Sequence, residues 1–379
     1  MFSNLLLQLI ILFLPTQFGL HFWPDFSRAA GVKIDFLSPT LYFTDTLLFL
    51  YLLSYHAQIF KWLKKNLSFC LTLFFFALAN TLLSVSPLNS FYWWVRLLGY
   101  LLFFLCLRLQ KVSWSQVKTP LILSTFFVVA LQIFQAIRQA SLGGLFYFLG
   151  ERSYTFSTPG LAKIDFFGRE ILRSPSLFSH PNSAAGYLLI VFYLLNVYKS
   201  PLWQKITLFF ALLLTLSKGA LLALALVIFF KISPLFLISF FFLLSLLELF
   251  SPSFPQATSF VSDRLFFMKS VKSLFLSHPL FGVGLGGFIP SLAKNLPGSF
   301  LTPAKLQPVH NLFLLALTEL GLFGVSLISF FIYQKRRFFK NPQLLGLLAL
   351  ICITGTFDHY WWTLPQNRLI LLFSLSLLL

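Results

Sequence analysis

The sequence alternates apolar segments of membrane-spanning length with short turns that are purely basic. The apolar segments lie at about residues 2–20, 40–60, 67–86, 91–107, 119–138, 182–198, 202–217, 219–231, 233–250, 310–332, 343–357 and 366–379. Five turns carry Lys and Arg without Asp or Glu, and they hold Lys61, Lys64, Lys65, Arg108, Lys111, Lys118, Lys199, Lys205, Lys231, Lys335, Arg336, Arg337 and Lys340. Because basic turns stay in the cytoplasm, the pattern predicts an all-α, polytopic membrane protein with about twelve transmembrane helices and both termini cytoplasmic.

Composition excludes a water-soluble globule. The chain is 58% hydrophobic and only 10% charged, whereas a soluble domain carries about 25% charged residues. A net charge of +18 would suggest nucleic acid in a soluble protein. Here the charge lies in loops, so we expect membrane lipids and phosphates as partners and no nucleic acid. The three cysteines lie in apolar runs without metal or redox spacing.

The segment 201–231 fits either one long helix or a hairpin broken at Ser217-Lys218-Gly219. A single helix would place the basic turn at Lys335 outside, against the positive-inside rule, so we predict the hairpin. Its arms are short for a bilayer, and a lone cation on short, Gly-interrupted helices favours a binding role for Lys218. In the alternative interpretation, Lys218 only extends to the outer headgroups.

The longest polar interval lies ahead of the last three predicted helices. We expect a single polytopic membrane domain over residues 1–379, with an outer loop at 139–181 and a large outer loop at 251–309 that carries part of the site. The large loop contains the glycine-rich run 282–287, where the backbone at Gly284 could approach a polyanionic ligand closely. The alternative is a flexible turn that binds no ligand.

Three cations lie early in the large loop, on a predicted interfacial helix at residues 262–276. They are Arg264, Lys269 and Lys272. Arg264 stands out because a guanidinium can contact a phosphate through two parallel hydrogen bonds. The alternative is an amphipathic helix that binds lipid headgroups through all three cations.

A titratable imidazole, His310, lies where the helix after the large loop is expected to begin. A neutral imidazole there could accept a proton from a sugar hydroxyl. The alternative is an interfacial histidine that caps or anchors the helix. Glu319, nine residues further on, falls on the opposite helix face, because successive residues turn by about 100°. We therefore expect Glu319 to pair with a neighbouring helix and not to orient His310.

Several classes of enzyme site are missing from the sequence. There is no Gly-x-Ser-x-Gly elbow, no His-Glu-x-x-His spacing and no Walker loop. The outer loops instead combine cationic side chains with aromatic rings and histidines, which suits a lipid-linked pyrophosphate that carries sugars. A lipid-linked oligosaccharide flippase or a polysaccharide transporter is the main alternative, but such proteins usually show internal repeats, and none is visible here.

Four motifs in a fixed order resemble those of the O-antigen ligase/polymerase family, polytopic C-type glycosyltransferases that use polyprenyl-pyrophosphate-linked glycans. The motifs are Ser179-His180-Pro181-Asn182, Leu216-Ser217-Lys218-Gly219-Ala220, Arg264 upstream of His278-Pro279-Leu280-Phe281-Gly282-Val283-Gly284, and His310-Asn311 followed by Glu319, Gly321 and Gly324. The resemblance spans roughly residues 180 to 325. The family usually has Arg where this chain has Lys218, and Lys keeps the charge but lacks the bidentate geometry.

The resemblance implies an inverting, metal-independent glycosyl transfer without a cofactor. Arg264 and Lys218 would hold the donor pyrophosphate, and His310 would act as the base toward the acceptor hydroxyl. The further positions predicted to bind substrate are His180, Asn182, Lys269, Lys272, Gly284, Asn311 and Glu319.

The same resemblance implies the partners and the location. The donor would be a polyprenyl-pyrophosphate-linked glycan, and the acceptor a glycan or glycolipid. The protein would lie in the plasma (inner) membrane with its active site facing outside, toward the periplasm where one exists. Ligation, repeat-unit polymerisation and transfer to protein stay open at this point, because the three activities share the fold and the motifs.

Overall fold

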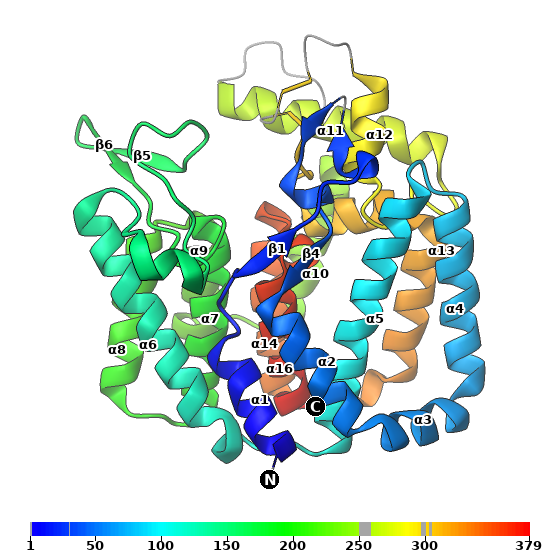
Figure 1. The fold of residues 1–379 in the computed structure, drawn as a ribbon, viewed down its shortest axis with the longest axis horizontal. Helices are drawn as coiled ribbons and strands as arrows, with labels where there is room; N and C mark the ends of the chain where they lie inside the picture. Colours follow the sequence, from blue (N-terminus) through cyan, green and yellow to red (C-terminus); the bar gives the residue numbers. More distant parts are fainter. Residues whose placement is uncertain (1, 30, 250–258, 297–300, 303–304) are drawn as a thin grey trace.

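The computed structural model describes residues 2–29, 31–249, 259–296, 301–302 and 305–379, and these are mostly helical (Figure 1). The α-helices are α1 Phe2–Leu12, α2 Phe43–Ser54, α3 His56–Lys65, α4 Leu67–Leu82, α5 Pro87–Leu109, α6 Trp114–Arg138, α7 Pro181–Val197, α8 Leu202–Thr215, α9 Lys218–Leu224, α10 Pro234–Glu248, α11 Ser259–Ser277, α12 Phe288–Asn295, α13 Leu312–Gln334, α14 Pro342–Phe357, α15 Tyr360–Thr363 and α16 Pro365–Leu378. Three short antiparallel pairs join β1 Gly19–His21 to β4 Thr40–Tyr42, β2 Arg28–Ala29 to β3 Val32–Lys33, and β5 Lys163–Phe166 to β6 Arg169–Leu172. A helical fold class is therefore confirmed.

Three described helices, α5, α6 and α13, are long and apolar enough to cross a membrane by themselves. Seven further apolar helices are shorter, which leaves the predicted number of twelve spans unconfirmed. The first basic turn is itself a helix. Lys61, Lys64 and Lys65 lie on α3, which is bent by 92° from α4 and crosses the foot of the bundle in Figure 1.

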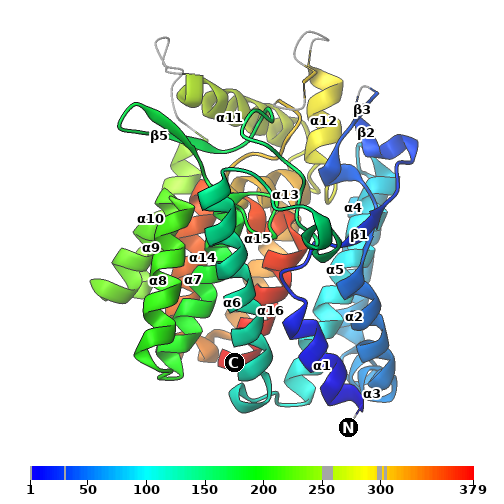
Figure 2. The ribbon, with the colours of Figure 1, turned by 60° about the vertical axis from the view of Figure 1, so that its left-hand side comes forward.

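The long loops and both chain ends lie at opposite ends of the bundle. Helices α11 and α12 and the strands β2, β3 and β5 gather at the top of Figure 2, whereas the N- and C-termini lie near its lower end. The two termini thus share one end of the bundle, as the predicted topology requires. Which side of a membrane that end faces stays a prediction.

Helix α7 lies in the middle of the bundle and is buried almost all round. Every residue from Ser183 to Leu195 is buried, which is typical of a helix enclosed by other helices. It packs against α8, α9, α14 and α16. The helix after it breaks at Leu216, where φ is +50°, and resumes at Lys218. The break therefore occurs where the hairpin prediction required one.

The glycine-rich loop inserts into a break in α13. Gly321 has φ +66° and ψ −175°, which interrupts the helix, and the backbone N–H groups of Val283 and Gly284 donate to the carbonyl oxygens of Thr318 and Glu319 at 2.9 and 3.1 Å. A Cβ at Gly321 would lie 2.3 Å from the Leu280 carbonyl oxygen. The glycine is needed because the two backbones touch and because its φ is positive.

Candidate active site

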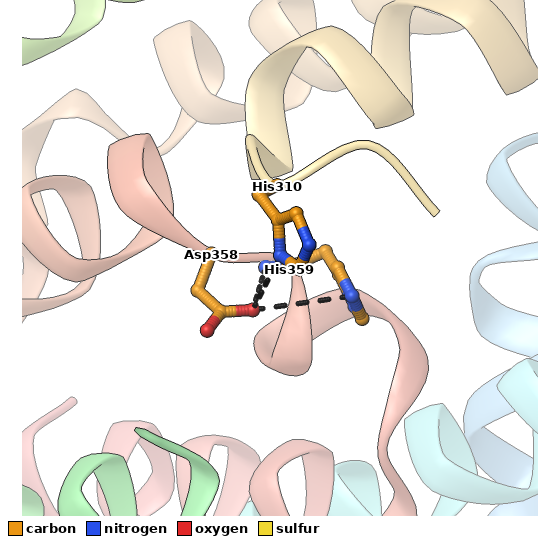
Figure 3. A group of neighbouring side chains, drawn as sticks. All are labelled: His310, Asp358 and His359. Carbon is orange, nitrogen blue, oxygen red and sulfur yellow. Dashed lines mark hydrogen bonds and ion pairs between the residues drawn. The ribbon is translucent and has the colours of Figure 1, made fainter. Parts of the chain in front are cut away.

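Four titratable side chains gather at the end of the bundle that carries the long loops. His180 is the N-cap of α7, His310 precedes Asn311, the N-cap of α13, and Asp358 and His359 lie between α14 and α15. Figure 3 shows His310, Asp358 and His359 converging. Nδ1 of His310 lies 3.7 Å from Oδ1 of Asp358, and Nε2 of His359 lies 3.9 Å from the same oxygen (Figure 3).

Asp358 is held in place by donors on two sides. Nδ2 of Asn182 donates to its Oδ2 at 2.8 Å, and the backbone N–H of His359 donates to its Oδ1 at 2.7 Å. Asn182 in turn accepts a hydrogen bond from Nη2 of Arg173 at 2.6 Å, and Nε of Arg173 donates to the Thr215 carbonyl oxygen at 2.9 Å. The predicted substrate-binding residue Asn182 thus uses both ends of its amide within the protein.

Burial and charge fix the protonation states around His310. Burial alone would raise the pKa of Asp358, but the His310 imidazole and the neighbouring histidines hold it well below its usual range. Burial lowers the pKa of His180 to about 4 and that of His359 to about 3. At neutral pH the cluster therefore holds one carboxylate and two neutral buried imidazoles. The His310 side chain is 36% exposed, against 10% for Asp358, so a substrate can reach it.

The structure brings Arg264 and His310 to one cavity of about 230 Å³. Its lining residues are Glu248, Arg264, Phe267, Met268, Val309 and His310. Arg264 comes from α11, which confirms the predicted helix in the large loop. Its Nη2 lies 3.4 Å from the carbonyl oxygen of Phe357, the residue just before Asp358. A guanidinium and an imidazole that lie far apart in the sequence thus face the same space.

The remaining predicted cations lie on the surface near this cavity, and none of them lines it. Lys218 is exposed at the start of α9. The next residue, Gly219, would place a Cβ only 3.5 Å from the Phe357 side chain, so the start of α9 lies beside the backbone that Arg264 contacts. Lys269 and Lys272 are exposed on α11.

Three other predicted substrate-binding residues contact the protein itself. Asn311 is fully buried, accepts from the backbone of α13 as its cap, and donates to Glu248 at 2.9 Å. Glu319 accepts from Nε1 of Trp362 at 2.8 Å, which agrees with the prediction that it faces away from His310 and meets another helix. A Cβ at Gly284 would lie 2.1 Å from Oγ of Ser84. Substrate binding by these residues stays a prediction.

Sequence reasoning missed Asp358, His359 and Arg173. The first two directly precede Tyr360-Trp361-Trp362, a cluster typical of a membrane-interface belt. The available signal was an Asp-His pair at the end of an apolar segment, because ionisable groups at such depth are usually functional.

Three side chains of the same cluster are of types that bind metal ions. One donor atom from each of His310, Asp358 and His359 lies within 4.8 Å of the others, and imidazole with carboxylate suits zinc. Nδ1 of His359 is already within 2.8 Å of Oγ1 of Thr363. Metal independence of the reaction stays a prediction.

Comparison with known protein families matches part of the chain. The family model described as O-antigen ligase matches residues 182–329, which run from the first turn of α7 to within α13 and include Lys218, Arg264 and His310. No curated protein and no solved structure matches the chain. The match supports a membrane glycosyltransferase-type role in surface polysaccharide assembly. The resemblance of this chain to the O-antigen ligase family is thereby confirmed over residues 182–329.

Proposed function

We propose that the chain transfers a glycan from a polyprenyl-pyrophosphate carrier to an acceptor hydroxyl at the outer face of the plasma membrane. The observation that carries this proposal is the pairing of His310 with the Asp358 carboxylate beside the Arg264 guanidinium. A base, a group that orients it and a phosphate-binding cation are the parts that a metal-independent glycosyl transfer needs.

His310 is placed to act as the general base. Its Nδ1 faces Asp358 (Figure 3), so the tautomer with the proton on Nδ1 leaves Nε2 free to accept. Nε2 takes the proton of the acceptor hydroxyl while the hydroxyl oxygen bonds to the anomeric carbon of the donor. The carboxylate of Asp358 stabilises the imidazolium that results.

The leaving group is the lipid diphosphate. The bond between the anomeric carbon and the phosphate oxygen breaks with its electron pair on that oxygen, and direct displacement inverts the anomeric configuration. Arg264 stabilises the charge that develops on the diphosphate. Lys218 is the proposed second contact, supported by the position of α9 beside Phe357. The exposed Lys269 and Lys272 are proposed to attract the diphosphate from the membrane surface.

The test is analysis of the lipid carrier in a strain that lacks this protein, complemented with wild type, His310→Ala or Arg264→Ala. We expect both variants to accumulate polyprenyl-pyrophosphate glycan on the outer leaflet, and the length of the stalled glycan separates a polymerase from a ligase. Lys205→Ala, a change in a predicted cytoplasmic turn, is the matched control and should behave as wild type. Accumulation on the inner leaflet would instead identify a flippase.

Metal dependence is tested on the purified protein. We expect transfer to persist at full rate after treatment with a chelator, since the carboxylate of Asp358 can orient His310 and stabilise its imidazolium directly. Loss of transfer that added zinc restores would show that His310, Asp358 and His359 hold a catalytic metal.

A further inference from the structure

A second cavity lies apart from the one that Arg264 and His310 share. It has a volume of about 350 Å³, and its lining includes Trp93 of α5, Gly286 of the glycine-rich loop, Glu319 of α13, and Trp362, Thr363 and Arg368 of the C-terminal segment. No step of the proposed transfer uses these residues. The cavity is nevertheless close to the base, because Thr363 contacts His359 at 2.8 Å and the His359 ring lies 5.3 Å from the His310 ring.

Two hydrogen-bond donors in this lining have no acceptor among the described residues. They are Nη1 of Arg368 and Nε1 of Trp93. Both residues are only 8% exposed. The guanidinium carbon of Arg368 lies 4.7 Å from the centre of the Trp93 ring, so the two donors are neighbours. Buried donors are nearly always satisfied, and each exception needs an explanation. A ligand that supplies acceptor oxygens explains both.

The same cavity offers an acceptor. Glu319 accepts from Trp362 through Oε2 at 2.8 Å, its Oε1 lies 3.5 Å from the Phe288 N, and the Gly286 backbone also faces this carboxylate. The distance of 3.5 Å is at the outer limit of a hydrogen bond, so Oε1 keeps capacity to accept. Glu319 and Arg368 thus bring opposite charges to one cavity, and a ligand there need not be charged.

The ligand must therefore both accept and donate hydrogen bonds while it stays neutral. A hydroxyl group does this, since its oxygen can accept from Arg368 or Trp93 while its proton is donated to Glu319. A phosphate or a carboxylate fits less well, because Glu319 would repel it. The indole rings of Trp93 and Trp362 add apolar surface for the C–H groups of a ring. A lining that is mostly apolar with a few convergent polar groups is typical of small-molecule sites.

We propose that this cavity is a subsite for one neutral pyranose ring of the glycan that the enzyme handles. The proposal rests on the proposed function, which supplies the glycan. The cavity is small, since its space of about 350 Å³ includes the open mouth, so the subsite is proposed for one ring and not for an oligosaccharide. Arg368 and Trp93 are then specificity-determining residues that hold a sugar next to His310.

Direct binding tests the subsite without any need for transfer. The probes are methyl glucoside, methyl galactoside, methyl mannoside, N-acetylglucosamine and glucuronic acid, each offered to the purified protein in nanodiscs and measured by saturation-transfer NMR. We expect at least one neutral pyranoside to bind and to bind more tightly than glucuronic acid. The proposal is overturned if no neutral sugar binds, or if glucuronic acid binds more tightly than the neutral sugars.

Three variants locate the bound sugar. Arg368→Met removes the guanidinium and should weaken binding by about 10-fold to 100-fold, the loss typical of a hydrogen bond to a charged group. Trp93→Phe keeps an aromatic ring but lacks the N–H, so it should weaken binding several-fold. It tests the subsite independently if Arg368→Met folds poorly. Lys205→Ala, in a predicted cytoplasmic turn, should bind sugar as wild type does. Unchanged binding in Trp93→Phe, or an equal loss in Lys205→Ala, would refute the assignment.

The outcomes separate the two proposals and the two sources of the sugar. If transfer requires His310 but sugar binding does not respond to Trp93→Phe, the subsite is wrong and the proposed function stands. If neutral sugar binds at Arg368 and Trp93 but no transfer occurs, the proposed function is wrong. In steady-state transfer, Trp93→Phe should raise KM for the donor if the ring belongs to the lipid-linked glycan, and for the acceptor if it belongs to the acceptor.

Discussion

Replacement of Asp358 by Asn tests how the candidate base is activated. The change keeps the size of the side chain, and its one oxygen can still accept from the His359 backbone, while its NH2 group faces Nδ2 of Asn182 in place of an acceptor. It removes the negative charge that lies 3.7 Å from Nδ1 of His310. The variant should therefore fold and bind substrate, but it should stabilise the imidazolium of the transition state less well.

The size of the effect follows from Coulomb's law. Two unit charges at 3.7 Å attract by about 4 kcal/mol at an effective dielectric constant of about 20. That energy corresponds to about 10³-fold in rate. The 36% exposure of the His310 side chain admits water and screens the pair, so we expect kcat to fall by about 10²-fold to 10³-fold with little change in KM.

The assay is single-turnover transfer by the purified protein from a polyprenyl-pyrophosphate-linked glycan. Asp45→Asn is the matched control, because Asp45 is a partly buried carboxylate that pairs with Arg96 at 3.0 Å and does not contact His310. It is expected to lower stability and leave the rate of the folded fraction near wild type. Transfer by Asp358→Asn within twofold of wild type would refute the pairing argument.

Three further predictions follow from the geometry. Gly284→Ala should lower the thermal unfolding temperature far more than Gly143→Ala, since both glycines have positive φ but only Gly284 would place a Cβ against Ser84; similar losses would contradict the packing of the glycine-rich loop. Because burial lowers the pKa of His180 and His359 below the value of about 6.5 in an unfolded chain, the unfolded state binds protons first at these two groups. Their contribution to stability should be constant above pH 6.5 and fall by on the order of a few kcal/mol toward pH 4. Thermal unfolding of wild type and His359→Gln in detergent across that range checks this, because the variant should lose less stability on acidification, and equal losses would refute it. Lys218→Ala should raise KM for the donor, whereas Lys218→Arg should leave that KM unchanged or lower it. Equal donor KM values for the two variants would exclude a phosphate contact.

The sequence was sufficient for those features that depend on local pattern. Apolar runs indicated helices, Ser217 marked the break after α8, and angular spacing placed Glu319 away from His310. Arg264 and His310 were identified singly by their chemistry, and the structure adds that they line one cavity.

Features that depend on how distant segments meet could not be predicted. The partner of His310 comes from the end of α14, and nothing local in the sequence relates the two positions. The break in α13 at Gly321 likewise depends on the loop at Leu280. The basic residues of α3 were expected in a turn, because positive charge indicates the side of the membrane and not the local conformation.

The site takes His180, His310 and Asp358 from three segments that are synthesised at different times. Ribosomal synthesis proceeds from the N-terminus, so α7 and α13 leave the ribosome before Asp358 exists. Until the segment from α14 to α16 is synthesised, Asn182 and His310 cannot contact Asp358, and α7 has no α14 or α16 to cover it. A chain that ends prematurely after α13 would keep the whole region that matches the family. It would nevertheless expose the polar side chains of His180, Asn182 and His310 without Asp358. Membrane quality control could recognise these exposed side chains and so distinguish the truncated product from the full-length protein.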